Sequence, residues 1–311
     1  MVRAKPTISV VIPTKNRPQD LITCLKSIIT QTVLPDEVVI VDASDEQALK
    51  SHLNQFSEMN TKYIPTARSG TTIQRNIGIR ASFGDIVVFS DDDMIWDEDF
   101  LKQILSVFKS YPPDRIGGVT ARIVFGTKAR EDGNLIKAGL SAIKRFLVTA
   151  FFLTREGDGK FQLSGMPTIV NNANQVTGCE FLYGGCMAFR RQVIEEFMFD
   201  ENLVGYGLGE DDDIAYRVSR KYQNYYTPHA QAIHSDASTS TSGNSYEHMT
   251  AMIQNRYYLF RKNLPQTLKH KLAFYWAVVG LFVVETLDGT RAQDYSGLKG
   301  LVRGLKHLRR S

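Results

Sequence analysis

Short apolar runs alternate with stretches of helical periodicity through the first 110 residues of this 311-residue chain. The runs are rich in β-branched residues, which predicts strands buried on both faces, as in a parallel sheet. These strands are expected at 8–12, 38–41, 62–64 and 84–90. Between them, apolar residues at helical spacing predict helices after Pro18, after Asp45, at 71–81 and at 97–109. Strands that alternate with helices form βαβ units, so we expect one half of a doubly wound α/β fold.

The pattern is less regular further along the chain, where residues 126–178 show no clear period and are expected to shape a pocket. Gly184 and Gly185 open a later apolar strand, and such a pair permits either close approach to a ligand or a tight turn. Further elements are expected at 117–124, 183–191, 225–233 and 246–262. We therefore expect a domain at 1–265, with halves at 1–124 and 125–265, followed by a helical extension at 266–311.

The C-terminal extension combines an apolar segment with a basic one. Residues 272–284 are uncharged and mostly apolar, but this run is shorter than the roughly 20 residues that span a bilayer. Leucines and a valine at 298–308 recur at helical spacing among basic residues, which predicts a peripheral anchor on an anionic membrane. The alternative is a helical hairpin packed on the domain or on another subunit. Nucleic acid is not an expected partner, because the basic residues lack interleaved aromatics.

Composition and charge set the broad class. A hydrophobic content of 43% and a charged content of 23% are ordinary for a globular protein. The net charge of +4 comes from the segment 291–311, which holds six basic residues and one acidic residue, so the body is nearly neutral. Cys24, Cys179 and Cys186 lie in apolar segments without C-x-x-C spacing, which predicts buried thiols in a reducing compartment. The N-terminal residues contain no signal-peptide pattern, so a cytoplasmic location is expected.

Three carboxylates, Asp91, Asp92 and Asp93, follow the strand at 84–90, and Asp42 follows the strand at 38–41. Ligands of open α/β sheets bind outside the carboxyl ends of the strands. Adjacent carboxylates repel one another unless a cation or a donor-rich ligand neutralises them. Because Mg²⁺ and Mn²⁺ bind through carboxylates and substrate phosphates, the pattern predicts a metal–diphosphate site. A solvated acidic turn is the alternative.

A second acidic cluster follows a glycine-rich loop at 205–209 and consists of Glu210, Asp211, Asp212 and Asp213. Acidic residues in a first helical turn are favoured by the helix dipole, so a simple helix start is the alternative to a functional site. Asp213 and Arg217 are four residues apart and are expected to pair on one helical face. Asp211 is the better candidate for chemistry. His234 ends a predicted strand and is a candidate metal ligand, although a lone histidine is commonly an ordinary residue.

Together these motifs resemble glycosyltransferase family 2, inverting enzymes of the GT-A fold (α/β, with a mostly parallel, Rossmann-like sheet), over about residues 8–262. The opening strand and loop, Val10 to Arg17, match the start of the family pattern, and Asp42 matches its nucleobase-binding aspartate. Residues 74–78 (Gln-Arg-Asn-Ile-Gly) resemble the helix whose arginine and asparagine face the nucleotide. Asp91–Asp93 match the Asp-x-Asp motif, while 199–201 and 209–213 match the acidic motif near the acceptor.

The resemblance implies a role for each matching residue. Asp211 is expected to be the catalytic base, and the expected acceptor-binding residues are Glu210, Asp212 and Gly185. The expected metal ligands, for Mn²⁺ or Mg²⁺, are Asp93, Asp91 and His234. The nucleotide diphosphate sugar is expected to contact Pro13, Thr14, Arg17, Asp42, Arg75, Asp91 and Asp92.

The donor implied by the family's commonest chemistry carries UDP, and the implied acceptor is a hydroxyl of a lipid-linked glycan or a polysaccharide. Two other functions fit the same residues. A sugar-phosphate nucleotidyltransferase also handles diphosphates with a metal at a sheet end, but it does not need the cluster at 210–213. A non-catalytic protein that binds nucleotide sugars is the other alternative.

Overall fold

The computed structural model describes residues 5–45, 53–125, 144–154, 156–170, 173–205, 207–235 and 245–308. The chain forms two compact units. The first comprises 1–126, 172–202 and 213–237, and the second comprises 127–171, 203–212 and 238–311. The boundary between the units falls inside helix α7 (Glu210–Ser219). The expected domain boundary at residue 265 stays a prediction.

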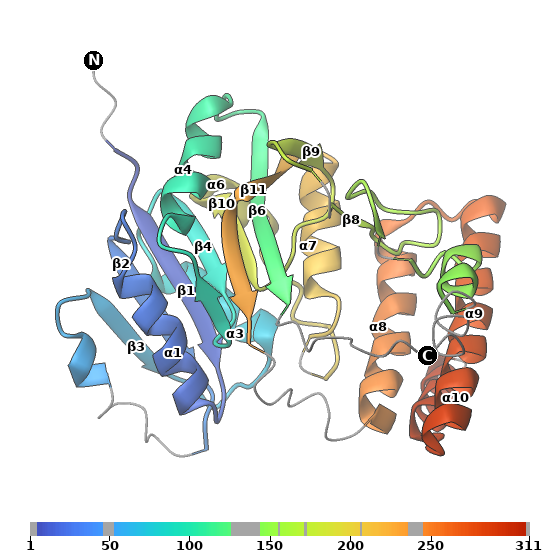
Figure 1. Ribbon diagram of the computed structural model, residues 1–311. Coiled ribbons are helices and arrows are strands. Elements are labelled where there is room, and N and C mark those ends of the chain that lie inside the picture. Colours follow the sequence, from blue (N-terminus) through green and yellow to red (C-terminus); the bar gives the residue numbers. More distant parts are fainter. Residues whose placement is uncertain are drawn as a thin grey trace, which may run out of the picture. The chain divides into compact units, whose positions relative to one another are not determined.

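The first unit is built on one mixed sheet (Figure 1), whose strand order is β3-β2-β1-β4-β10-β6-β11-β5, with β9 paired to β11. Its strands are β1 (Ile8–Thr14), β2 (Glu37–Asp42), β3 (Thr61–Pro65), β4 (Ile86–Ser90), β5 (Met94–Trp96), β6 (Ile116–Phe125), β9 (Thr177–Cys179), β10 (Cys186–Arg190) and β11 (Gln223–His234). Strands β1 to β4 run parallel, which confirms the predicted βαβ half. Strand β10 is antiparallel to both β4 and β6, an insertion that the sequence pattern does not predict.

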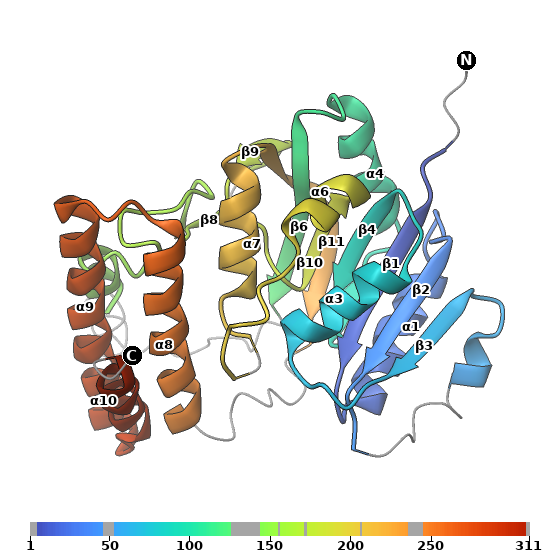
Figure 2. The same ribbon diagram turned by 180° about the vertical axis from the view of Figure 1, so that it is seen from behind.

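Helices cover both faces of this sheet. Helices α1 (Pro18–Ile29) and α4 (Phe100–Ser110) lie on one face, and α3 (Thr71–Ala81) and α6 (Arg191–Phe197) lie on the other (Figures 1 and 2). A Cβ atom on Gly78 of α3 would lie 2.2 Å from Val11 Cγ1, so glycine permits this helix to approach β1 closely. Because β1 runs parallel to both β2 and β4, the carboxyl ends of these three strands lie at one edge of the sheet.

A helix is expected after Asp45, but residues 46–52 lie outside the described residues. Leu53–Phe56 form a short 3₁₀ helix. The expected irregular segment 126–178 also begins outside the described residues. Its described part contains β7 (Glu156–Gly157) and β8 (Ile169–Val170), which pair with each other.

Three long helices dominate the second unit: α8 (Ser245–Asn263), α9 (Leu268–Ala292) and α10 (Ser296–Leu308). Helix α9 has 25 residues, so the expected apolar run at 272–284 is only its central part. Among the described residues, α9 is the one helix with the length and apolar composition of a membrane span. It ends at Gln293, whose left-handed conformation (φ 54°) stops the helix.

The three cysteines are free and buried, as predicted. Burial raises the pKa of Cys24 and of Cys186 to about 12, and it also raises the pKa of Cys179. Neutral thiols are weak nucleophiles, so none of these cysteines has the environment of a reactive residue.

Candidate active site

The acidic turn Asp91–Asp93 lies between β4 and β5 at the carboxyl edge of the sheet. Asp42 ends β2, and the parallel register sets it opposite Thr14, the last residue of β1. Pro13 of β1 is buried beside Val41 in the same register. The structure thus brings these predicted nucleotide-site residues to one sheet edge, the side where open α/β sheets bind ligands.

Asp92 is directed into the body of the unit. Thr14 Oγ1 donates to Asp92 Oδ2 at 2.7 Å, and Arg17 Nη1 donates to Asp92 Oδ1 at 3.0 Å. Burial raises the pKa of Asp92 to about 7 even though both donors favour its charged form. Because both of its oxygens have protein partners, Asp92 is better placed to fix the turn than to hold a ligand.

Arg17 bridges two members of the turn, since Nη1 also donates to Asp93 Oδ2 at 3.0 Å. The second oxygen, Asp93 Oδ1, is buried and accepts no hydrogen bond from the described residues. His234 Nε2, at the end of β11, lies 3.6 Å from this oxygen. Burial and the neighbouring charge of Asp91 raise the pKa of Asp93, the signature of a carboxylate that lacks sufficient positive charge around it.

Asp91 has a buried counter-charge below it. Arg75 Nη2 donates to Asp91 Oδ1 at 2.8 Å and to the Gly184 carbonyl at 3.0 Å. The guanidinium is fully buried and lies 5.9 and 5.3 Å from the ring centroids of Phe89 and Phe199. The Asp91 side chain, in contrast, is 35% exposed, the most open of the three carboxylates. In this structure the Arg75 guanidinium is buried and binds Asp91, and it is not exposed at the surface of the site.

Gly185 belongs to the same place. Its carbonyl accepts the Asp91 N–H at 3.3 Å, and a Cβ atom on Gly185 would lie 3.0 Å from Asp91 Oδ2. Any side chain at this position would crowd the carboxylate. Gly184 and Gly185 form a tight turn in which the Cys186 N–H donates to the Tyr183 carbonyl at 3.2 Å, so the structure shows the turn that the glycine pair permits.

Two polar residues that sequence reasoning missed complete this edge. Gln74 Nε2 donates to the carbonyls of Thr14 and Val41, both at 2.8 Å, and so ties the ends of β1 and β2 together. Tyr63 donates to Asp42 Oδ2 at 2.7 Å, while Ser44 N–H donates to Asp42 Oδ1 at 2.8 Å. The sequence offered no separate signal for Gln74, because the buried residues of α3 also include the polar Thr72, Arg75 and Asn76. Asp42 is therefore held in a fixed orientation.

The resemblance implies that Asn76 faces the nucleotide. In the structure its side-chain amide instead binds Phe199 and Glu201. Its Nδ2 donates to the Phe199 carbonyl at 2.9 Å and to Glu201 Oε1 at 3.0 Å. The Phe199 N–H donates back to Asn76 Oδ1 at 2.9 Å. These three bonds join α3 to the segment after α6, so in this structure Asn76 fixes the fold around the site.

The donor set of the acidic turn fits a hard divalent cation. Among the described residues, no three His, Cys, Asp or Glu side chains form a complete metal-binding group. The residues do offer the under-neutralised Asp93 Oδ1, the partly exposed Asp91 carboxylate and the imidazole of His234. The carboxylate oxygens of this set suit Mg²⁺ or Mn²⁺. Asp92 adds nothing to that set, because Thr14 and Arg17 already engage it.

The second acidic cluster opens α7. Asp213, in the first unit, is buried and binds Arg217 through two contacts of 2.9 and 2.7 Å, which confirms the predicted pair. In the second unit, the Asp212 N–H donates to Asp211 Oδ1 at 2.9 Å, and Arg256 Nη1 lies 3.8 Å from Asp212 Oδ2. The Glu210 N–H donates to the Gly207 carbonyl at 3.0 Å. Asp211 belongs to the second unit and Asp93 to the first.

The loop before this cluster is held by α8. Asn255 Oδ1 accepts the Val204 N–H at 2.9 Å, and Asn255 Nδ2 donates to the carbonyls of Val204 and Leu208 at 3.0 and 2.9 Å. Gly205, Gly207 and Gly209 adopt positive φ angles of 69°, 96° and 86°. The positive φ angles favour glycine at these positions of the loop. Asn255 holds the loop through its hydrogen bonds, a role that was not predicted from the sequence.

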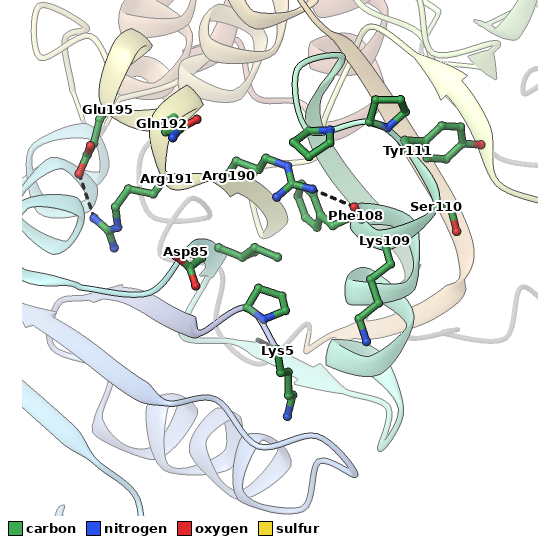
Figure 3. A pocket seen from close by; sticks show the side chains of 14 residues that line it. Lys5, Asp85, Phe108, Lys109, Ser110, Tyr111, Arg190, Arg191, Gln192 and Glu195 are labelled. Carbon is green, nitrogen blue, oxygen red and sulfur yellow. Dashed lines mark hydrogen bonds and ion pairs between the residues drawn. The ribbon is translucent and has the colours of Figure 1, made fainter. Parts of the chain in front are cut away.

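A pocket of about 1300 Å³ lies at the opposite edge of the sheet (Figure 3). Its lining includes Ile86, the first residue of β4, and none of the predicted site residues. Its charged groups are largely engaged with the protein: Arg191 pairs with Glu195 at 3.0 Å, and Arg190 donates to the Phe108 carbonyl at 2.9 Å (Figure 3). This hollow is unrelated to the chemistry expected at the carboxyl edge.

Comparison with solved structures confirms the GT-A fold. A mannosyltransferase from Pyrobaculum calidifontis, solved with GDP-Man and Mn²⁺, superposes with a TM-score of 0.58 at 17% identity, covering 97% of this chain and 88% of that one. S. aureus TarS 1-349, solved with UDP-GlcNAc, has a TM-score of 0.57 at 14% identity, covering 96% of this chain and 91% of that one. Identities this low establish a shared fold and do not assign a substrate.

Sequence comparison gives the family. Glycosyltransferase GlyA of Streptococcus pneumoniae is 32% identical over 109 residues, a stretch that is 34% of this chain and 16% of GlyA. This chain therefore matches only a small part of that relative's length. The model of the family described as "Glycosyl transferase family 2" matches residues 9–198, more than half of the 311 residues. The chain belongs to glycosyl transferase family 2.

Proposed function

We propose that the chain is an inverting, metal-dependent glycosyltransferase that moves a sugar from a nucleotide diphosphate to a hydroxyl acceptor. The observation that carries this proposal is that the three carboxylates of the acidic turn have different environments. Asp92 is bound by Thr14 and Arg17, while Asp91 remains partly exposed and no described residue donates a hydrogen bond to Asp93 Oδ1. An Asp-x-Asp arrangement with an inward middle residue leaves the outer carboxylates for a cation.

The proposed donor site follows from the sheet edge. In this proposal the nucleobase lies beside Asp42, whose carboxylate Tyr63 and Ser44 hold in a fixed orientation, and the nucleotide lies along the end of β1 at Pro13 and Thr14. A divalent ion held by Asp91, Asp93 and His234 supplies Lewis-acid neutralisation of the diphosphate charge that develops as the sugar leaves. Two of the similar structures contain Mn²⁺.

The proposed acceptor chemistry belongs to the second cluster. Inversion needs a base on the face of the sugar opposite the leaving group, and Asp211 takes the proton of the acceptor hydroxyl there. A positioned carboxylate base contributes about 10²–10⁴-fold to such a reaction. Glu210 and Asp212 orient the acceptor, and residues 126–178 select it. The acceptor is a lipid-linked or polysaccharide glycan, and the enzyme works in the cytoplasm at the inner face of the cell membrane, which residues 272–311 contact.

The decisive experiment compares Asp211→Asn and Asp93→Asn with Asp114→Asn, an exposed aspartate on the loop before β6. Asp211→Asn is expected to keep Mn²⁺-dependent donor binding but to lose about 10²–10⁴-fold in transfer rate. Asp93→Asn is expected to weaken donor binding in the presence of Mn²⁺, and Asp114→Asn to change neither. The measurements are titration calorimetry with UDP- and GDP-sugars and product analysis by mass spectrometry.

Several outcomes of this experiment contradict the proposal. Transfer rates near wild type in both Asp211→Asn and Asp93→Asn would contradict the proposed mechanism. A product that retains the nucleotide on the sugar would show a nucleotidyltransferase. Metal-dependent donor binding without transfer or donor hydrolysis would indicate a binding protein. Similar structures hold GDP-Man and UDP-GlcNAc, so both bases are included in the donor screen.

A further inference from the structure

The outward face of α9 is apolar along the N-terminal half of the helix. Leu268, Leu272, Tyr275 and Val279 follow one another at intervals of three or four residues and are 72%, 62%, 55% and 49% exposed. Residues at this spacing share one face of a helix. Glu285 is the one charged residue between Lys271 and Asp288. The exposed side chains therefore form a continuous apolar strip, which we call the α9 face and define as Leu268, Leu272, Tyr275, Trp276 and Val279.

The opposite face of α9 is fixed by packing within the same unit. Phe274 stacks on Phe260 of α8 with ring centroids 4.3 Å apart. A Cβ atom on Gly280 would lie 2.2 Å from Phe151 Cβ, so the helix and the segment at Phe151 are in close contact. Trp276 Nε1 donates to the Ala150 carbonyl at 2.8 Å, which satisfies the one polar atom of that side chain. The α9 face is thus presented outward by a helix that is held on its other side.

Helix α10, which the sequence singled out as the amphipathic anchor, uses its inner face for internal packing. A Cβ atom on Gly300 would lie 2.3 Å from the Tyr246 carbonyl oxygen, and one on Gly304 would lie 2.2 Å from Ile253 Cγ2, so α10 and α8 are in close contact. Leu301 is fully buried in the same interface. The outer side of α10 carries Lys299, Arg303 and Lys306 around the partly exposed Val302. The large apolar surface of this unit is therefore on α9.

The charges beside the α9 face favour an anionic partner. The chain contains no Asp or Glu between Glu247 and Glu285. Four exposed basic residues lie where α8 ends and α9 begins, namely Arg261, Lys262, Lys269 and Lys271. A second copy of this chain would present the same excess of positive charge, whereas the phosphates of an acidic bilayer would neutralise it.

We infer that the α9 face lies in the interface of an anionic lipid bilayer, with its side chains at the boundary between headgroups and acyl chains. The four basic residues then contact lipid phosphates, and Tyr275 and Trp276 occupy the depth that amphipathic aromatic rings prefer. A helix of 25 residues is about 37 Å long and could cross a membrane. Its packed face, with Phe274 and Gly280, favours a helix that lies on the bilayer. This inference rests on the proposed function, for which it supplies the membrane-contacting surface.

The test is co-sedimentation of the full chain with vesicles made of equal parts phosphatidylcholine and phosphatidylglycerol. Wild-type protein is expected to bind these vesicles, to bind pure phosphatidylcholine more weakly, and to lose binding as salt is raised. The double variant Leu272→Glu/Val279→Glu is expected to lose at least about tenfold in partition coefficient. Lys269→Glu and Lys271→Glu are each expected to lose about fivefold.

Two matched controls isolate the surface. Leu34→Glu replaces a leucine that is 55% exposed in the first unit and is expected to leave binding unchanged. Lys299→Glu/Lys306→Glu places the same charge changes on the outer side of α10 and is expected to reduce binding by less than Lys269→Glu/Lys271→Glu. Circular dichroism and melting temperature establish that each variant is folded.

Wild-type binding by the folded Leu272→Glu/Val279→Glu variant would overturn the inference. A larger loss of vesicle binding in Lys299→Glu/Lys306→Glu than in Lys269→Glu/Lys271→Glu would also overturn it. So would a Leu272→Glu/Val279→Glu variant that changes from dimer to monomer in light scattering but binds vesicles like the wild type. Donor hydrolysis in lipid-free buffer separates this result from the proposed function. A wild-type chain that binds vesicles but never hydrolyses donor contradicts the proposed function alone, whereas one that hydrolyses donor and ignores vesicles contradicts the inference alone.

Discussion

The chain carries two acidic clusters of similar composition, and the fold neutralises them in different ways. The charges of Asp91–Asp93 are met by Arg75 and Arg17, which lie 16 and at least 75 residues away along the chain. Asp213 is met by Arg217, one helical turn later in α7. The first cluster therefore depends on the assembled sheet, whereas the pair in the second depends mainly on a local helix. The first is expected to be more sensitive to loss of its partner.

Removal of Arg75 should give the largest effect. Arg75→Met takes away the buried guanidinium that contacts Asp91 and the Gly184 carbonyl, so we expect the free energy of unfolding to fall by about 3–5 kcal/mol. The control, Arg68→Met, breaks an ion pair with Glu201 whose arginine is 61% exposed, and should cost less than about 1 kcal/mol. Urea denaturation measures both. Equal small losses would mean that the buried charge has little influence on stability.

Loss of the support beneath the second cluster should rank next. Asn255→Leu removes three hydrogen bonds to the loop at Val204 and Leu208, and about 1 kcal/mol for each bond predicts a loss of about 3 kcal/mol. Hydrogen exchange should show faster exchange of the Val204 amide. The neighbouring Gln254→Leu, a half-buried position on α8, serves as the control. Unchanged protection of Val204 in Asn255→Leu would show that the glycines alone hold the loop.

The smallest of the three effects concerns α7 itself. Asp213→Asn weakens the contacts with Arg217 and should lower the free energy of unfolding by about 2 kcal/mol. Asp211→Asn, two residues earlier, should change stability by less than about 0.5 kcal/mol, although it is expected to abolish most of the transfer activity. A thermal melt beside an activity assay separates the two. Equal stability losses in Asp213→Asn and Asp211→Asn would contradict the assignment of a structural role to Asp213 and a catalytic role to Asp211.

Local pattern predicted most elements of this fold. The helix at 71–81 is observed with the expected bounds, and the strands at 8–12, 38–41 and 62–64 are each part of an observed strand. The antiparallel insertion of β10 between β4 and β6 was not foreseen, because strand pairing is set by contacts between distant residues. The length of α9 was underestimated, since Lys271 and Glu285 bound the uncharged run at 272–284 without ending the helix.

The site was predictable to a similar degree. The position of Asp42 and Asp91 at strand ends follows from apolar runs that stop at an acidic residue, and the Asp213–Arg217 pair follows from helical spacing. The inward direction of Asp92 could not be foreseen, because it depends on Thr14 from another strand. Gln74 and Asn255 were missed for the same reason: each acts through backbone groups that only the folded chain brings within reach.

The buried cysteines make the chain a convenient carrier for a single optical label. All three native thiols are buried and have raised pKa values, so they are expected to react slowly with a maleimide dye at neutral pH. A cysteine introduced at the exposed position of Val279 would then be the one site that reacts rapidly. Fluorophores there that respond to polarity would report directly whether this side of the helix enters lipid, without removal of any native cysteine.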